Sequence, residues 1–255
     1  MHPILLQIGG FTLRSYGLMA AIGFLAAAWL LGKNRSYAKM SADQASAALF
    51  IAMIAGIVGA RIFYVVQFFD QYRDHLWRIV RIDQGGLVFY GGFLLAIAAL
   101  WVYAHRQKLD IIRILDVCTP AIALAHACGR IGCFLNGCCY GKPTGLFWGV
   151  RYPAGSEAAL RYPGEALHPV QLYEAGGQFL LCFLYFYLVR HTRRGVAMSC
   201  YLIFYGTFRF LNELLRGDNP RVFELFTPAQ LIGLAIIPAG VLLLVHFLRH
   251  GNQKA

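Results

Sequence analysis

Charged residues are scarce in this chain. Asp, Glu, Lys and Arg together make up 14% of the 255 residues, whereas apolar residues make up 58% and the mean hydropathy is +0.55. A soluble domain carries about 25% charged and about 45–50% apolar residues. This composition therefore excludes an ordinary globular protein and is typical of a polytopic membrane protein.

Three further features are missing from the sequence. The N-terminal segment MHPILLQIGGFTLRSYG has neither the basic start nor the small-residue cleavage site of a signal peptide, so we expect it to be retained. No low-complexity tract, long linker or internal repeat divides the chain, which predicts a single membrane domain over residues 1–255. No basic run exceeds two residues, so the net charge of +11 does not indicate a nucleic-acid partner.

Apolar stretches of about 20 residues, the length of helix that crosses a bilayer, occur seven times in the chain. We therefore predict an all-α, polytopic membrane protein with about seven transmembrane helices and an outer loop over residues 136–169. The expected spans are 14–32, 47–69, 86–104, 114–135, 170–189, 196–215 and 226–248.

The distribution of Lys and Arg predicts how these helices are oriented. Of the 23 such residues, 11 follow the first, third, fifth and seventh spans, nine are spread over longer loops on the other side, and three lie inside spans. Short loops rich in Lys and Arg stay in the cytoplasm. We predict that the N-terminus is periplasmic and the C-terminus cytoplasmic.

The three arginines inside the spans, Arg61, Arg130 and Arg209, all fall in the half of the protein that this orientation places outside. A charged side chain in lipid costs roughly 2.5–3.5 kcal/mol on insertion scales, so such groups usually face a cavity. We therefore expect one cavity in the outer half, and we expect it to open outward.

The segment YGTFRFLNELLRG, residues 205–217, places Tyr205, Arg209, Glu213 and Arg216 on one helix face. One interpretation is a structural ion pair of Arg209 with Glu213. Two arginines for one glutamate leave a surplus positive charge. The surplus suits a phosphate, which arginine binds with two parallel hydrogen bonds.

Arg130 lies in CGRIGCFLNG and has no acidic residue three or four positions away. It could reach the membrane interface and bond to backbone carbonyls. We favour a phosphate ligand instead, because the glycines at 129, 132 and 137 allow a headgroup to approach closely.

Three of the seven cysteines, Cys133, Cys138 and Cys139, lie close together in the sequence. Their spacing matches none of the common zinc motifs. A disulfide, a metal site and ordinary packing remain open; packing is preferred and metal is least favoured. We accordingly predict no metal and no cofactor.

Three residues are candidate proton acceptors. Tyr90 lies between two glycine pairs in GGLVFYGG and would need a neighbouring cation to act as a base. His126 and His168 are the others, although a lone histidine is more often structural. The segment HPVQLYE adds Gln171 and Glu174 near the same helix start as His168.

Together these segments resemble one family. GRIGCFLNGCCYG is similar to the signature of the prolipoprotein diacylglyceryl transferases, whose usual form is close to G-R-[IL]-G-N-F-x-N-G-E-x-x-G. Four further blocks resemble the family in the same order, so the resemblance covers essentially the whole chain. They are RSYGLM at 14–19, GGLVFYGG at 85–92, HPVQLYE at 168–174 and YGTFRFLNELLRG at 205–217.

The resemblance implies an activity and its partners. Such enzymes transfer the diacylglyceryl group of phosphatidylglycerol to the lipobox cysteine of a prolipoprotein signal peptide, in the bacterial cytoplasmic (inner) membrane, and release glycerol 1-phosphate. Arg130 and Arg209 would stabilise the leaving phosphate, and Tyr90 would be the third catalytic residue. The predicted substrate-binding residues are Tyr16, Arg61, Asn136, Gly141, His168, Gln171, Glu174, Tyr205, Glu213 and Arg216.

The chain departs from the family pattern at three positions. Cys133 stands in place of an asparagine, Cys138 in place of a glutamate, and Tyr90 at a position often held by histidine. The usual candidate for the general base is therefore missing. Two alternative functions are a paralogue with a phospholipid donor and a different acceptor, and an anion transporter, against which the absence of repeats argues.

Overall fold

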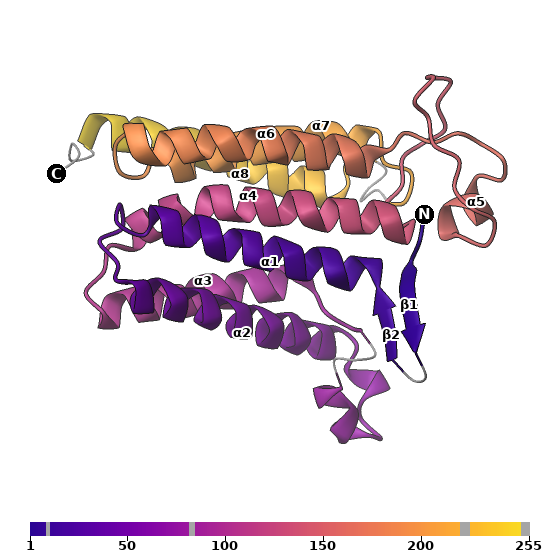
Figure 1. The fold of residues 1–255 in the computed structure, drawn as a ribbon, viewed down its shortest axis with the longest axis horizontal. Helices are drawn as coiled ribbons and strands as arrows, with labels where there is room; N and C mark the ends of the chain where they lie inside the picture. The colour runs from indigo at the N-terminus through magenta and orange to yellow at the C-terminus, as the bar shows by residue number, and fades with distance from the viewer. Residues whose placement is uncertain (9–10, 82–84, 220–224, 251–255) are drawn as a thin grey trace. The chain divides into compact units, whose positions relative to one another are not determined.

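The computed structural model describes residues 1–8, 11–81, 85–219 and 225–250. Arg221 and Lys254, which enter the count of loop cations, lie outside the described residues. The elements in chain order are shown in Figure 1. They are β1 Ile4–Ile8, β2 Phe11–Arg14, α1 Ser15–Asn34, α2 Ala42–Gln67, the short 3₁₀ helices Phe69–Gln71 and Leu76–Val80, α3 Phe89–Arg106, α4 Ile111–Asn136, α5 Glu157–Arg161, α6 Val170–His191, α7 Val196–Leu214 and α8 Pro228–His250.

The predicted spans are all helical. Among the described residues, α1 to α4 and α6 to α8 are the helices of 18 residues or more, and each coincides with a predicted span to within five residues at either end. Five of them, α1, α2, α4, α6 and α8, are long and apolar enough to cross a membrane. The prediction of a helical, polytopic fold is confirmed at that level, and the count of seven crossings stays a prediction.

The purely α fold class is wrong at the N-terminus. Strands β1 and β2 pair antiparallel, with Gln7 opposite Thr12 and Ile8 opposite Phe11, and they precede α1 directly. The segment ILLQIGGFTLR contains a Gly-Gly pair between two apolar runs, which is a hairpin signal. Hydropathy alone does not separate that signal from the start of the first span.

The chain divides into two compact units. The first unit comprises Met1–Asn34 and Leu115–Ala255, and the second comprises Arg35–Ile114. The single domain over residues 1–255 stays a prediction, and each unit is described by itself.

The second unit is built on α2 and α3, which lie side by side in Figure 1. Helix α2 begins with a capping box, in which the Ser41 hydroxyl accepts from the Gln44 amide at 3.1 Å and the Gln44 side chain accepts from the Ser41 amide at 3.0 Å. The two helices approach closely at glycines: a Cβ at Gly59 would lie 2.5 Å from the carbonyl oxygen of Gly91. Only glycine allows this spacing.

In the first unit, α7 packs against both α6 and α8, and α1 packs against α4. A Cβ at Gly132 would meet Met19 at 3.1 Å, and one at Gly23 would meet the Ala125 carbonyl at 3.1 Å. The start of α7 is fixed from α4, because the buried Asp116 carboxylate accepts from the amides of Gly195 (2.6 Å) and Met198 (2.9 Å). Asp116 thereby satisfies amides that α7 cannot pair internally.

Candidate functional site

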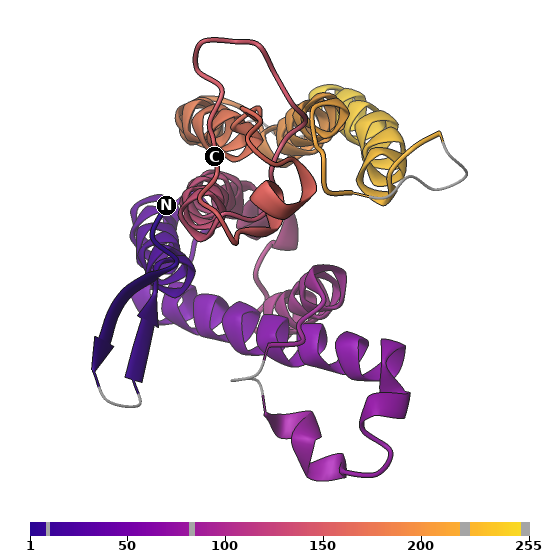
Figure 2. The ribbon, with the colours of Figure 1, turned by 90° about the vertical axis from the view of Figure 1, so that its right-hand side faces the viewer.

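The polar residues of the first unit gather at one end of its helix bundle. The C-terminal half of α4, the start of α6 and the end of α7 all lie at the end where the chain begins (Figure 1), and Figure 2 views the unit from that end. The intervening loop, residues 137–169, and the N-terminal hairpin lie at the same end. The other ends of α6, α7 and α8 lie at the end of the bundle that carries the C-terminus (Figure 1).

Arg130 and Glu174 form the central contact of this site. Arg130 Nη2 lies 3.1 Å from Glu174 Oε1, and the Glu174 side chain is 1% exposed. His126, one turn before Arg130 on α4, places its Nε2 3.0 Å from the same oxygen and 3.1 Å from Arg130 Nε. A ring nitrogen either donates or accepts, so His126 Nε2 can bond to only one of these two groups in a given protonation state.

Asn212 connects this contact to α7. Its side-chain amide donates to Glu174 Oε2 at 3.1 Å and approaches the Val170 carbonyl at 3.4 Å. Because Glu174 and Asn212 are both buried, the α6 carboxylate has partners on α4 and on α7. The three helices are thus joined through one buried glutamate.

The second group lies at the end of α7. Arg209 Nη1 donates to Glu213 Oε2, which is the structural ion pair that the sequence left as one interpretation, and Asn219 donates to Glu213 Oε1. Arg216 binds Asp218 through two hydrogen bonds, from Nε at 2.9 Å and from Nη2 at 2.7 Å. Burial opposes the charged form of Arg216, but the bonds to Asp218 outweigh it and raise the pKa of the guanidinium.

The predicted surplus of positive charge in the 205–217 segment is wrong. Asp218, two residues beyond Arg216, supplies the missing negative charge, so Arg209 and Arg216 each have a carboxylate partner. The sequence analysis considered only acidic residues three or four positions away on the same helix. It missed Asp218 because this residue lies beyond the end of α7. For the same reason it missed Glu174 as the partner of Arg130 and Asn212 as the partner of Glu174, which come from other turns and other helices.

Arg130 and Arg209 nevertheless keep unused hydrogen-bond donors. The contacts of Arg130 engage Nε and Nη2, and the contact of Arg209 engages Nη1, among the residues that the structure describes. Their side chains remain 15% and 13% exposed, respectively. The carboxylates fix the guanidinium planes and leave Nη1 of Arg130 and Nε and Nη2 of Arg209 for another acceptor.

Three cysteine sulfurs meet near Arg130 and Arg216. The Sγ atoms of Cys133, Cys138 and Cys139 all lie within 4.8 Å of one another, and all three thiols are free. Hydrogen bonds from Cys133 and Cys138 lower the pKa of Cys139, and the positive charges of Arg216 and Arg130 lower it further against the effect of burial. The cysteines therefore lie within electrostatic range of two of the arginines.

Several predicted binding residues build the loop that carries the cysteines. Gln171 is buried and donates to the Cys138 carbonyl at 2.8 Å. It also bonds to the hydroxyl of Tyr152, whose pKa burial raises to about 12 against the opposing effect of the Gln171 hydrogen bond. A Cβ at Gly141 would lie 2.4 Å from the His168 carbonyl, so this position requires glycine.

The remaining predicted residues of the first unit lie around this centre. Tyr16 is 48% exposed, and a Cβ at Gly132 would lie 3.3 Å from its ring. Asn136 is the last residue of α4, two positions before Cys138. His168 Nδ1 lies 3.3 Å from the Tyr173 hydroxyl, and the Tyr205 ring lies 5.6 Å from the His126 ring. Roles in substrate binding for these residues stay predictions.

Arg61 and Tyr90 belong to the second unit. Arg61 is buried and donates to backbone carbonyls that follow α2: Nε to Ile79 (2.7 Å), Nη1 to Gly85 (2.9 Å) and Gly86 (3.0 Å), and Nη2 to Arg78 (2.7 Å). This arrangement favours a structural role for Arg61. Tyr90 lies in the first turn of α3 and is 45% exposed. The single outward cavity stays a prediction.

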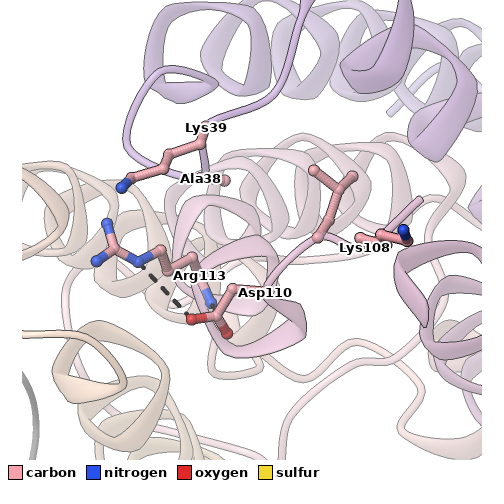
Figure 3. Close-up of a pocket in the computed structure, with 6 residues that line it drawn as sticks. Ala38, Lys39, Lys108, Asp110 and Arg113 are labelled. Carbon is pink, nitrogen blue, oxygen red and sulfur yellow. Dashed lines mark hydrogen bonds and ion pairs between the residues drawn. The ribbon is translucent and has the colours of Figure 1, made fainter. Parts of the chain in front are cut away.

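A cavity of about 340 Å³ lies elsewhere in the second unit (Figure 3). It is lined by Ala38, Lys39, Lys108, Leu109, Asp110 and Arg113. Two of these residues, Asp110 and Arg113, form an ion pair at 3.7 Å (Figure 3). None of the predicted site residues lines it, so it is not the candidate reaction centre.

Comparison with known proteins identifies one family. The family model described as "Prolipoprotein diacylglyceryl transferase" matches residues 3–246. The chain is 34% identical over 242 residues to a phosphatidylglycerol–prolipoprotein diacylglyceryl transferase of Clostridium tetani, covering 94% of this chain and 96% of the relative. It is 33% identical over 264 residues to the enzyme of that name from Pseudoalteromonas translucida, covering 100% and 96% of the two chains.

Proposed function

This chain belongs to the prolipoprotein diacylglyceryl transferase family, and we infer that it transfers the diacylglyceryl group of phosphatidylglycerol to a prolipoprotein in lipoprotein maturation. The acceptor is the thiol of the lipobox cysteine, and the product that leaves is glycerol 1-phosphate. Membership of this family over nearly the whole chain argues against the anion transporter considered above.

The observation that carries the catalytic proposal is the pair of incompletely bonded guanidiniums, Arg130 and Arg209. The reaction forms a bond from sulfur to a glycerol carbon and breaks the bond from that carbon to a phosphate oxygen. Negative charge grows on the departing phosphate, and fixed donors aimed at such charge are usually the largest contribution to catalysis. Arg130 and Arg209 carry unused donors, and we assign this role to them.

Glu174 and Glu213 act in this proposal as positioning residues. Each holds one side of a catalytic guanidinium, so that the arginine does not reorganise when the headgroup arrives. Their charges also lower the energetic cost of burying the arginines in an apolar bundle. Tyr16, Asn136, His168 and Tyr205 lie around the same centre and are proposed to contact substrate.

The proposal includes a membrane arrangement. All seven long helices cross the bacterial inner membrane, the N-terminus is periplasmic and the C-terminus is cytoplasmic. The reaction centre, at the end of the first unit that carries the N-terminus, then lies near the periplasmic leaflet. An exported prolipoprotein and phosphatidylglycerol of the outer leaflet both have access to that position.

The catalytic assignment is tested with purified enzyme, phosphatidylglycerol and a fluorescent lipobox peptide, by measuring both peptide lipidation and glycerol phosphate release. We expect Arg130→Ala and Arg209→Ala each to reduce kcat by roughly 10²–10³-fold, the usual effect of removing one fixed donor to a developing negative charge. Arg106→Ala is the matched control, because Arg106 is an exposed arginine at the end of α3.

Comparable thermal stability of the variants in detergent would show that a loss of activity is not a loss of fold. Full activity of both arginine variants would contradict the assigned roles. Lipidation of a peptide whose cysteine is replaced by serine would contradict the thiol acceptor.

A further inference from the structure

The cysteine cluster, Cys133, Cys138 and Cys139, which the sequence favoured as packing residues, brings three sulfur atoms close enough to share one metal ion. Tetrahedral zinc with sulfur ligands at about 2.3 Å places those sulfurs about 3.8 Å apart. The three Sγ atoms lie within 4.8 Å of one another, which is within about 1 Å of that spacing. Within the described part of the chain, no fourth His, Cys, Asp or Glu joins the cluster.

Backbone conformation and hydrogen bonds hold the cluster in place. Gly137 (φ +76°) ends α4, and Cys139 (φ +62°) adopts a left-handed conformation that is uncommon for a residue with a side chain. The Cys138 amide bonds to the Cys133 carbonyl at 3.2 Å, and the buried Gln171 side chain bonds to the Cys138 carbonyl at 2.8 Å. A site preformed in this way loses little conformational entropy when an ion binds.

We propose that Cys133, Cys138 and Cys139 bind one Zn²⁺, and that the fourth coordination position takes the thiol of the acceptor cysteine. Three thiolates suit a borderline-soft ion, and zinc has no redox chemistry of its own. Zinc sites with three protein ligands and an open position are typical of catalysis, whereas structural sites are closed. The proposal rests on the transferase function inferred above.

A zinc ion at this site explains how the acceptor thiol is deprotonated in a chain that lacks the usual general base. A free cysteine thiol has a pKa of about 8.5, so little of it is thiolate near neutral pH, and the usual candidate base is absent. Coordination to Zn²⁺ deprotonates a thiol outright, and the proton passes to water. The bound thiolate attacks the glycerol carbon of phosphatidylglycerol, a C–S bond forms, the C–O bond breaks, and its electron pair leaves on the phosphate oxygen. The neutral thioether is a weaker ligand and dissociates, and no electron is gained or lost.

The surroundings of the cluster fit this role. Arg130 precedes Cys133 by three residues on α4, and Arg216 pairs with Gly141, two residues after Cys139, so the metal-bound thiolate and the arginine that receives the departing phosphate lie in one region. Three thiolates with one Zn²⁺ carry a net charge of −1, and a fourth thiolate makes the net charge −2. Nearby guanidiniums stabilise that charge, and Cys138 and Cys139 are only partly buried, which leaves access for a ligand.

The site is tested first by metal content. The full-length protein, purified in detergent from medium containing zinc and without chelators, should contain roughly one zinc ion per chain. Cys133→Ser, Cys138→Ser and Cys139→Ser should each lower the zinc content at least about tenfold. Cys128→Ser is the matched control and should retain zinc, because Cys128 lies on the same helix but outside the cluster.

The fourth position is tested with cobalt. Co²⁺ in the site should show thiolate charge-transfer absorption that changes when a lipobox peptide is added and does not change with its Cys→Ser counterpart. Zinc-free protein, a metal content unaffected by the three substitutions, or a disulfide between two of the three cysteines in the protein as purified would overturn the site.

Activity separates this proposal from the function on which it rests. Removal of zinc should abolish transfer to the peptide, and added Zn²⁺ should restore it. Transfer at full rate by metal-free protein would contradict the zinc proposal and leave the transferase function intact. A zinc-loaded protein that binds peptide and phosphatidylglycerol but transfers nothing would contradict the transferase function, while metal content would still report on the site.

Discussion

Arg61 and Arg130 both lie inside long apolar helices, and both follow a small residue directly, in GARIF and CGRIG. Their environments differ in a way that sequence does not reveal. Arg61 donates to four backbone carbonyls, whereas Arg130 is bonded to side chains and keeps an unused nitrogen. At the residue scale, the number of free donors separates an arginine that stabilises a loop from one that can bind a headgroup.

A substitution of Arg61 tests this distinction. Lysine keeps the charge but has one nitrogen, which cannot reach carbonyls on both sides as the guanidinium does. We expect Arg61→Lys to lower the free energy of unfolding by about 2 kcal/mol or more, since buried hydrogen bonds from charged groups are worth about 1.5–3 kcal/mol each. The thermal unfolding midpoint in detergent measures this, with the exposed Arg106→Lys as control.

The opposite pattern would favour the other role. Unchanged stability of the Arg61→Lys variant with a raised KM for phosphatidylglycerol would mean that Arg61 contacts substrate, as the sequence predicted.

At the element scale, the pairing of α2 with α3 depends on glycines rather than on large side chains. A Cβ at Gly59 would lie 2.5 Å from a backbone carbonyl of α3, whereas a Cβ at Gly56, one turn earlier on α2, would lie 4.0 Å from the nearest one. The sequence shows both glycines at helical spacing and treats them as equivalent. Only the helix–helix geometry distinguishes the position that must be glycine from the position that tolerates alanine.

These two glycines form a matched pair for mutagenesis. We expect Gly59→Ala to force the helices apart and to lower the unfolding midpoint by several degrees, an effect of about 2 kcal/mol typical of overpacking. Gly56→Ala should leave the midpoint unchanged or raise it slightly, because alanine favours the helix by about 1 kcal/mol. Equal midpoints for the two variants would contradict the observed closeness of α2 and α3.

At the scale of the whole molecule, the apolar runs predict the helices well, because a bilayer requires about 20 apolar residues for each crossing and internal backbone hydrogen bonding. The tertiary partners could not be predicted in this way. Glu174 reaches Arg130 from another helix, and Asp218 reaches Arg216 from beyond the end of α7. The cysteine cluster depends on the left-handed backbone conformation of Gly137 and Cys139. Periodicity describes one element at a time, and these contacts join several.

The orientation of the whole molecule in the membrane is predicted from the distribution of Lys and Arg among its loops. The inner loops predicted from Lys and Arg density include residues 105–113, and the predicted outer loop, residues 136–169, lies at the polar end of the first unit (Figure 1). Alkaline phosphatase is active only outside the cytoplasm, and green fluorescent protein matures only inside it. We expect phosphatase activity for fusions after Gly155 and fluorescence for fusions after Lys108 and after the C-terminus. The reverse pattern would place the arginines and the cysteine cluster near the cytoplasmic leaflet, where an exported acceptor cysteine cannot reach them.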